Sequence, residues 1–423
     1  MRAPPTSSTP AAGRLSGRLA FAAVLSLLTT LPAAAQYVPE RGAWERRAPT
    51  AVGMDAALLE AAVAFAEANE TSVDRDQELS QMQSFGREPL GHGIGPFRVR
   101  GGAAGVIVRN GYIVAEWGDV HRVDMTHSVT KSFLSTVVGL ALDDGLVRSL
   151  DDLAADYMAP VELPPGDGEE GVDRTAFGDP DLATLFTSEH NRRITWRHLL
   201  QQNSDWAGTL WGKPDWADRP DRDTGTWLGE DRAAPGTEYE YNDTRVNLLA
   251  LLATGVWRRP LPVVLRERVM DPIGASPTWR WHGYDNSWIP LDGQWVQSVS
   301  GGGHWGGGMF INALDQARFG LFTLRRGQWG DTRILSDDWF TEATTPSVPE
   351  PGYGFMNYFL NRPDEEGRKR YPSAPDEAYA HIGNGTNMVY VDPVNDLVVV
   401  ARWIPGGAID EFLGMVLSSI DGG

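Results

Sequence analysis

The chain has 423 residues, 42% of them hydrophobic and 10% aromatic, and a formal net charge of −19 at pH 7. This length and composition allow a large buried core and predict a globular protein. The negative charge opposes contact with nucleic acid phosphates, so we expect no nucleic acid partner. Because the chain has no cysteine, disulfides, thiolate metal sites and a cysteine nucleophile are excluded.

Residues 1–35 have the pattern of an export signal. Three arginines come first, an apolar run extends from Leu19 to Leu31, and small residues precede Gln36. This order predicts a signal peptide cleaved at about Ala35/Gln36, and hence a periplasmic or secreted protein with no stable membrane anchor after cleavage. A short membrane anchor is the alternative, although the apolar run is shorter than the roughly 20 residues that span a bilayer.

The first clear local structure of the remaining chain is a hairpin at residues 102–119. Two runs rich in β-branched residues, Val106–Val108 and Tyr112–Val114, flank the dipeptide Asn110-Gly111. Asn and Gly tolerate the positive φ angles of a tight two-residue turn. The pattern therefore predicts two antiparallel strands.

The segment HSVTKSFLSTVVGLALDDG, residues 127–145, is predicted to be a helix. Its apolar residues Phe133, Val137 and Leu140 recur at helical spacing. The pattern ends at Gly145, a residue suited to the position just after a helix C-cap.

The region from about 150 to 290 is predicted to be mostly helix and loop, because it shows few strand signals. It contains an acidic loop rich in proline and glycine at 161–181, and helical patterns at 195–202 and 246–256.

Strand patterns return after residue 291. Residues 381–391 and 396–403 are predicted to be strands joined by the turn Asp392-Pro393, and a final helix follows at 410–419.

This order of elements predicts an α+β fold. An antiparallel β-sheet would be flanked by helices and would carry a mostly helical insert lobe at about 150–290. We expect one domain over residues 101–423, preceded by an N-terminal extension at 36–100.

Ser128 and Lys131 lie three residues apart at the start of the predicted helix, in a chain with only three lysines. Positions i and i+3 share one helix face, so a hydroxyl and an amine come within reach of each other, as a nucleophile and a base. To act as a base near neutral pH, the pKa of Lys131 must fall from about 10.4 to about 7, which burial and nearby positive charge can bring about. The alternative is a solvated lysine with no role in catalysis.

Two further motifs follow in order. Tyr241 lies in PGTEYEYNDT, and His381-Ile382-Gly383 lies on a predicted strand. With Ser128-Val129-Thr130-Lys131, they resemble the three-motif layout of penicillin-recognising serine enzymes. The resemblance is to the serine β-lactamase-like superfamily, and within it to class C β-lactamase-related and penicillin-binding-type serine hydrolases, which include many esterases and peptidases. It extends from about Gly102 to the C-terminus, and further matching phrases are SLDD at 149–152, ITWRHLLQQNSDW at 194–206, SGGGHWGGGMF at 300–310 and HIGNGTNMVYVDP at 381–393.

The resemblance implies a β-lactamase/transpeptidase-like fold and a role for each motif residue. Ser128 would be the nucleophile, Lys131 its proton partner, and Tyr241 the residue that shuttles a proton in acylation and deacylation. The backbone N–H groups of Ser128 and Asn384 would form the oxyanion hole.

Two positions depart from the family pattern. Asp243 stands where the family's Tyr-x-Asn motif has an amide, and its carboxylate is expected to raise the pKa of Lys131. His381 and Gly383 lie where the family often has Lys-Thr-Gly. A histidine there weakens the expected binding of a β-lactam or D-Ala-D-Ala carboxylate, so hydrolysis of other esters and amides ranks above antibiotic hydrolysis.

No metal or cofactor is expected. The eight histidines show no His-Glu-x-x-His spacing, and His121 and His127 lack a third ligand nearby. The glycine cluster Gly301–Gly308 lacks the ending of a phosphate-binding loop, and it is predicted to be a tight loop near the site.

The sequence thus predicts a serine hydrolase that forms an acyl-enzyme on Ser128 and acts on a small-molecule ester, amide or peptide. The alternative is a non-hydrolysing or weakly active penicillin-binding-type protein that holds a peptide, such as a cell-wall sensor.

Overall fold

The computed structural model describes residues 36–158, 184–220, 232–363 and 367–420. The predicted signal segment and the predicted loop at 161–181 lie outside the described residues. Residues 36–423 form one compact unit.

The main sheet has six strands, and every neighbouring pair is antiparallel. Their order across the sheet is β11 (Tyr358–Phe359), β12 (Tyr379–Gly383), β13 (Asn387–Asp392), β14 (Leu397–Arg402), β1 (Ala104–Arg109) and β2 (Tyr112–Trp117).

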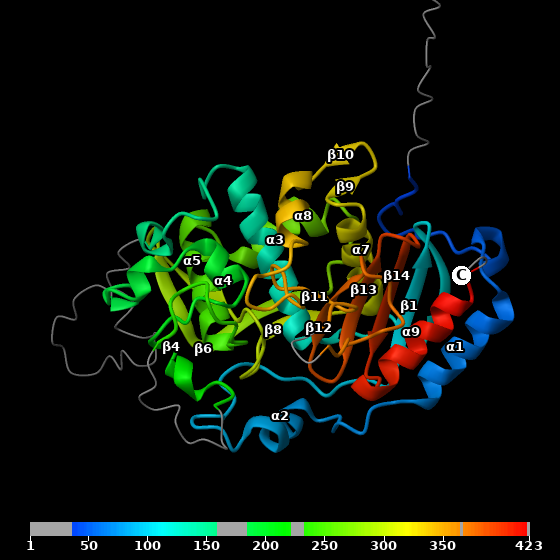
Figure 1. The fold of residues 1–423 in the computed structure, drawn as a ribbon, viewed down its shortest axis with the longest axis horizontal. Helices are drawn as coiled ribbons and strands as arrows, with labels where there is room; N and C mark the ends of the chain where they lie inside the picture. The colour runs from blue at the N-terminus through cyan, green and yellow to red at the C-terminus, as the bar shows by residue number, and fades with distance from the viewer. Residues whose placement is uncertain (1–35, 159–183, 221–231, 364–366, 421–423) are drawn as a thin grey trace, which may run out of the picture. The chain divides into compact units, whose positions relative to one another are not determined.

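Helices cover both faces of this sheet (Figure 1). The helix α7 (Ala313–Leu324) packs on one face, and α1 (Ala56–Ala68) and α9 (Ile409–Ser418) pack together on the other. Successive side chains of a strand point to opposite faces of the sheet, so one strand contributes to both cores. In β14, Val398 and Val400 lie in the core on the α7 side, and Val399 lies in the core next to α1 and α9.

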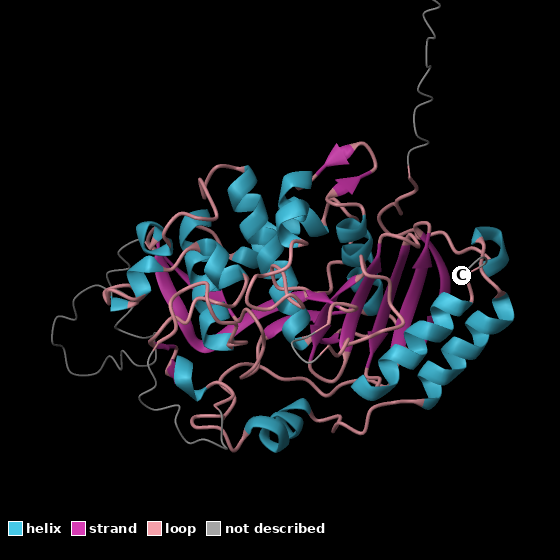
Figure 2. Cartoon of the chain, viewed as in Figure 1, coloured by secondary structure: helices cyan, strands magenta, loops and turns pink. Residues whose placement is uncertain are grey.

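The second region combines helices with a smaller sheet (Figure 2). Its strand order is β3 (Asp124–Met125), β8 (Gly308–Ile311), β6 (Arg280–Leu291) and β7 (Gln294–Val299). Its helices are α4 (Trp196–Leu200), α5 (Asp243–Trp257) and α6 (Leu261–Leu265). Shorter elements are α2 (Gln77–Phe85), α8 (Asp337–Ala343), the strand pair β4 (Thr209–Leu210) and β5 (Lys213–Pro214), and the hairpin β9 (Gln328–Trp329) and β10 (Thr332–Arg333).

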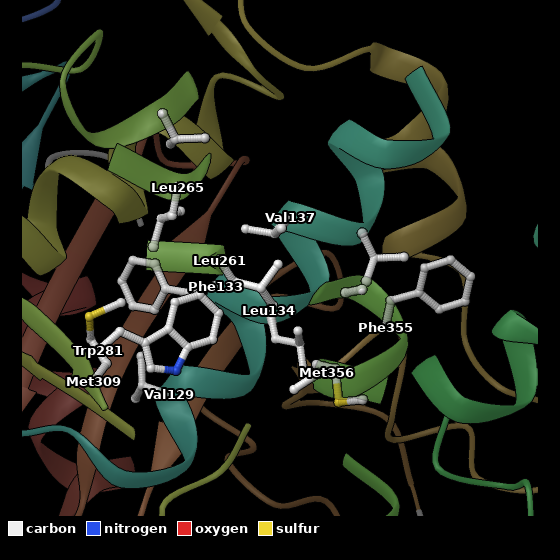
Figure 3. Close-up of a cluster of buried hydrophobic side chains, with 14 of the residues drawn as sticks. Val129, Phe133, Leu134, Val137, Leu261, Leu265, Trp281, Met309, Phe355 and Met356 are labelled. Atoms are coloured by element: carbon white, nitrogen blue, oxygen red, sulfur yellow. The ribbon is translucent and has the colours of Figure 1, made fainter. Parts of the chain in front are cut away.

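The helix α3 (Thr130–Asp143) lies between these two regions. It is buried almost all round, which is expected of a helix in the interior of a large domain. Phe133 stacks on Phe319 of α7 with ring centroids 4.0 Å apart. Figure 3 shows side chains of α3 among apolar neighbours from other elements; these neighbours include Leu261, Leu265, Trp281, Met309, Phe355 and Met356.

The predicted α+β arrangement is confirmed. The hairpin of β1 and β2 turns at Asn110 and Gly111, both with positive φ. The predicted helix starts with a short 3₁₀ turn, η2 (His127–Val129), and Gly145 follows the end of α3 with a φ of 71°.

Two predicted elements are wrong in detail. Residues 381–391 are not one strand, because Gly385 and Thr386 have positive φ and turn the chain between β12 and β13. The predicted helical lobe also ends in a strand, β6. Polar and aromatic residues alternate irregularly along that strand, so it has no clear period-2 pattern.

Among the described residues, no single helix is long and apolar enough to cross a membrane. The consecutive helices 243–257 and 261–270 meet the length and composition test only as a pair, and a bend of 72° separates them.

Candidate active site

Ser128 lies in the turn η2, directly before α3, and is half-buried. The hydroxyl of Thr130 donates to the carbonyl of His127 at 2.5 Å and accepts from the amide of Met309 at 2.9 Å. Thr126 also donates its amide to the carbonyl of Met309. These bonds fix the turn against β8, so the position of Ser128 is set by hydrogen bonds of the residues on both sides of it.

The amine of Lys131 points at this serine. Its Nζ donates to Ser128 Oγ at 3.0 Å and to Asp243 Oδ1 at 2.7 Å. The lysine side chain is fully buried, as is Asp243 at the first turn of α5. A buried lysine that bonds to a serine hydroxyl is the arrangement expected of a nucleophile with an adjacent base.

Opposing effects set the charge of this pair. Burial lowers the pKa of Lys131, Asp243 raises it and the charge of Arg219 lowers it again, so the pKa lies below the ordinary lysine value. Burial alone would raise the pKa of Asp243, but Lys131 and Arg219 outweigh burial and hold it below the ordinary aspartate value. The carboxylate therefore stays ionised at neutral pH.

Arg219 is the second cation of the site. Its Nη1 lies 2.9 Å from Asp243 Oδ2 and 2.5 Å from Asp218 Oδ1. Its Nη2 donates to Nδ1 of His304 at 2.9 Å, so the imidazole proton is on Nε2, which donates to Glu88 Oε2 at 2.8 Å. The chain of contacts from Ser128 thus continues through Lys131, Asp243 and Arg219. It then passes through His304 to Glu88, which lies just after α2.

Glu88, Asp218 and His304 each bring one possible ligand atom within 4.8 Å of the others. Arg219 contacts two of these three residues and so supplies positive charge at this place. Burial and the charge of Arg219 hold the pKa of His304 well below 6.5. We assign the cluster as a hydrogen-bond network around a guanidinium rather than as a metal site.

Tyr241 closes the site from the side of α5. Lys131 Nζ lies 4.5 Å from the centre of its ring, and the ring of Tyr358 of β11 lies 6.5 Å from it. The hydroxyls of Ser128 and Tyr358 are close enough to lower the pKa of Tyr241. Burial and the charge of Asp243 raise the pKa of Tyr241 above the ordinary tyrosine value. The phenol is therefore neutral at neutral pH and can donate its proton.

The strand β12 lies along the other side of Ser128. A Cβ atom on Gly383 would lie 3.0 Å from the amide nitrogen of Ser128 and would collide with the carbonyl of Thr126. Asn384 follows directly and is exposed, and its side-chain oxygen accepts from the amide of Gly385 at 2.9 Å. The glycine thus allows the end of the strand to approach the backbone of the nucleophile.

His381 is not part of this network. Its ring is buried, with centroids 5.5 Å from Phe319 and 5.8 Å from Tyr379. Neither ring nitrogen has a hydrogen-bond partner among the described residues, and burial lowers the pKa of His381 to about 3. The imidazole is therefore neutral, and the structure brings it into hydrogen-bond contact with none of the other predicted site residues.

The glycine cluster reaches the site through Gly302. Its carbonyl accepts from Ser128 Oγ at 3.4 Å, and a Cβ atom there would collide with Lys131 Nζ and Asp243 Oδ1. The predicted extension holds this loop in place, because the amides at 94 and 95 donate to the carbonyl of Trp305 at 2.9 and 3.1 Å.

The sequence motifs therefore identify Ser128, Lys131, Tyr241, Asp243 and Gly383, and the structure brings these five together. Sequence reasoning missed the network beyond Asp243 and the tyrosine next to Tyr241. The glycine run was an available signal for Gly302 and His304, but no motif marks the others, which are Glu88, Asp218, Arg219 and Tyr358.

Comparisons with known proteins bear on the family and the fold. The family model described as Beta-lactamase matches residues 95–402. A search of curated proteins gives no match.

Solved structures share the fold at low sequence identity. EstCE1, described as a hydrolase with promiscuous acyltransferase activity, is 16% identical with a TM-score of 0.51, over 86% of this chain and 99% of that one. SurE, solved with D-Leu, is 14% identical with a TM-score of 0.52, over 86% and 76%. A β-lactamase from Mycobacterium bovis is 20% identical with a TM-score of 0.47, over 75% and 93%. Since the family model covers most of the chain, this protein belongs to the β-lactamase family.

Proposed function

We propose that this protein is a serine hydrolase that cleaves an ester or amide bond through an acyl-enzyme on Ser128. The observation that carries the proposal is the hydrogen bond of 3.0 Å between the buried Lys131 Nζ and Ser128 Oγ. Members of the β-lactamase family are usually serine hydrolases.

In the proposed reaction, the neutral amine of Lys131, with Tyr241, takes the proton of Ser128 as Oγ attacks the substrate carbonyl carbon. The carbonyl oxygen becomes an oxyanion, held by the backbone N–H groups of Ser128 and Asn384. As the bond to the leaving group breaks, the leaving alcohol or amine receives the proton. Water then attacks the acyl-enzyme, the acid is released, and the proton returns to Ser128.

The role of Asp243 follows from its contacts. Asp243 Oδ1 accepts a hydrogen bond of 2.7 Å from Lys131 Nζ and so holds the lysine in place. A strong ion pair would also keep the lysine protonated. Arg219 binds the other carboxylate oxygen at 2.9 Å and so shares the negative charge. The site can therefore hold the lysine in place while its pKa stays below the ordinary value.

The proposal includes export. The N-terminal pattern favours cleavage at about Ala35/Gln36 and a periplasmic or secreted enzyme that acts on small ester, amide or peptide substrates. Sequencing the N-terminus of the protein recovered from an exporting host tests this. A mature chain that still begins at Met1 would overturn it.

The test of the reaction is hydrolysis of 4-nitrophenyl butyrate by the wild type and by Ser128→Ala. The wild type should release 4-nitrophenol, and intact-mass measurement should detect a butyryl adduct on Ser128. The variant should lose turnover and retain the circular dichroism of the wild type, because only one half-buried oxygen is removed. Full activity in Ser128→Ala would overturn the mechanism, and a folded wild type that never forms an adduct would favour the peptide-binding alternative.

A further inference from the structure

A cavity of about 540 Å³ opens beside Tyr241, on the side where β11 and the loop after it lie. This volume is within the usual range of small-molecule sites. Tyr241 lines the cavity, and its ring lies 4.5 Å from Lys131 Nζ, which bonds to Ser128, so the cavity adjoins the proposed nucleophile. Its lining comprises five aromatic residues, Tyr239, Tyr241, Tyr353, Tyr358 and Phe359, together with Glu350, Gly352, Arg362, Arg368, Lys369 and Arg370.

The aromatic wall is held in a fixed arrangement. The ring of Tyr353 lies 5.1 Å from that of Tyr239 and 4.9 Å from that of Tyr358. The hydroxyl of Tyr353 accepts a hydrogen bond from Gln202 Nε2 at 2.6 Å. A wall of packed rings offers flat apolar surface to a ligand at little cost in side-chain entropy.

The rim is basic although the chain is strongly acidic overall. Arg362, Lys369 and Arg370 are exposed and form no ion pair with any described carboxylate. Arg370 lies over the ring of Tyr358 at 4.6 Å and Arg362 over that of Phe359 at 5.1 Å. Both guanidinium groups therefore rest on the aromatic wall with their N–H edges available to an anion.

Among the described residues, the acidic side chains of the lining do not neutralise the positive charge of the rim. Glu350 is the one described carboxylate that lines the cavity, and one of its oxygens accepts from the amide of Gly352 at 3.0 Å. The sequence also places Asp364, Glu365 and Glu366 between the basic residues, outside the described part of the chain. Four basic residues and one acidic residue line the described cavity.

We propose that this cavity binds the carboxylate of a substrate whose apolar or aromatic part lies against the tyrosines, while Ser128 attacks its ester or amide bond. The inference rests on the proposed function and names its substrate class. The buried, unpaired His381 offers no cation on β12, so the basic rim would supply the anion recognition. Carboxylate pairing with arginine is strong when two parallel hydrogen bonds form.

The experiment compares matched pairs of esters that differ by one carboxylate. For the acyl side, the pair is mono-4-nitrophenyl glutarate and 4-nitrophenyl pentanoate. For the leaving-group side, the pair is 4-butanoyloxybenzoate and its methyl ester. We expect kcat/KM to favour the charged member in one of the two pairs, and this preference should shrink with added salt because the rim is exposed.

The variants test whether the rim causes the preference. Arg370→Gln and Arg362→Gln should each lower the ratio of kcat/KM for the charged and neutral esters by about twofold to fivefold. The matched control is Arg333→Gln, an exposed arginine on β10, which should leave the ratio unchanged.

The two proposals fail in different ways. If the wild type hydrolyses neutral esters through Ser128 but shows no preference in either pair, or a preference that Arg370→Gln does not lower, the cavity inference is wrong. If no ester is hydrolysed, the proposed function fails, and fluorescence titration with 4-phenylbutyrate then tests the cavity. Saturable binding that Arg370→Gln weakens would support the cavity, and its absence would overturn it.

Discussion

The two sides of Ser128 are built differently. On the side of α3 and α5, buried charged side chains touch one another, from Lys131 and Asp243 to Arg219. On the side of β12, Gly383 lies against the backbone amide of Ser128. His381, two residues before this glycine, hydrogen-bonds to no described residue. This contrast separates two tasks: side chains can move protons on one side, and backbone amides can stabilise an oxyanion on the other.

The largest effect is expected on the charged side. Lys131→Arg keeps a positive charge but removes the base, because arginine does not deprotonate in this range. We expect kcat/KM for a 4-nitrophenyl ester to fall by at least about 10² to 10⁴.

The matched control for this variant is Lys213→Arg. Lys213 is equally buried, and its Nζ donates to the carbonyls of Leu90 and His92, away from the nucleophile. This variant should keep most of the activity if it folds. Near-normal hydrolysis by Lys131→Arg would show that the lysine is only a structural cation.

A smaller loss of kcat/KM is expected from a change on the side of β12. Gly383→Ala places a methyl group against Thr126 and the amide of Ser128, so the end of β12 must move away. Because the proposed oxyanion donors would then separate, kcat/KM should fall by roughly 10². Steady-state kinetics with the same ester measure this.

Gly407→Ala is the control for the added methyl group, since nothing lies within 4 Å of its Cβ position. It should hydrolyse the ester as the wild type does. If Gly383→Ala were equally active, β12 would take no part in the reaction.

The smallest effect is a shift in pH dependence. Asp243 raises the pKa of Lys131, so Asp243→Asn should move the acidic limb of the kcat/KM profile to lower pH while the amide still accepts from Lys131. This limb belongs to the coupled group of Lys131 and Tyr241 rather than to either residue. A pH profile with the chromogenic ester checks the direction.

Asp396→Asn is a suitable control, because this carboxylate pairs with Arg325 by the main sheet. Its profile should match that of the wild type. A limb that moves to higher pH in Asp243→Asn would mean that the carboxylate does not govern the lysine.

Local patterns explain what the sequence could predict. Ser128 and Lys131 share one turn of a helix, so their spacing alone brings the two groups together. The strand β14 was predicted because five of its six residues form an apolar run, and the structure buries all six. The hairpin of β1 and β2 was predicted from the turn chemistry of two residues.

Long-range contacts explain what the sequence could not predict. His304 and Glu88 are 216 residues apart in the sequence, and no periodic pattern links them. Arg219 stands in an irregular segment after η7 (Asp215–Ala217), so nothing local distinguishes it from the other arginines of the chain. The division of 381–391 into two strands depends on a turn that includes Thr386, a residue uncommon at positive φ.

The hydrogen bond from His304 to Glu88 leads us to expect that an active protein needs the segment before residue 101. Shortening the chain to residues 101–423 would leave the imidazole N–H without its acceptor, and would remove α1 from the apolar face of α9. We therefore expect the smallest active chain to begin before α1, although the family model starts at residue 95. The segment before residue 101 thus supplies part of the proposed active site, and trimming it should act like a mutation at the site.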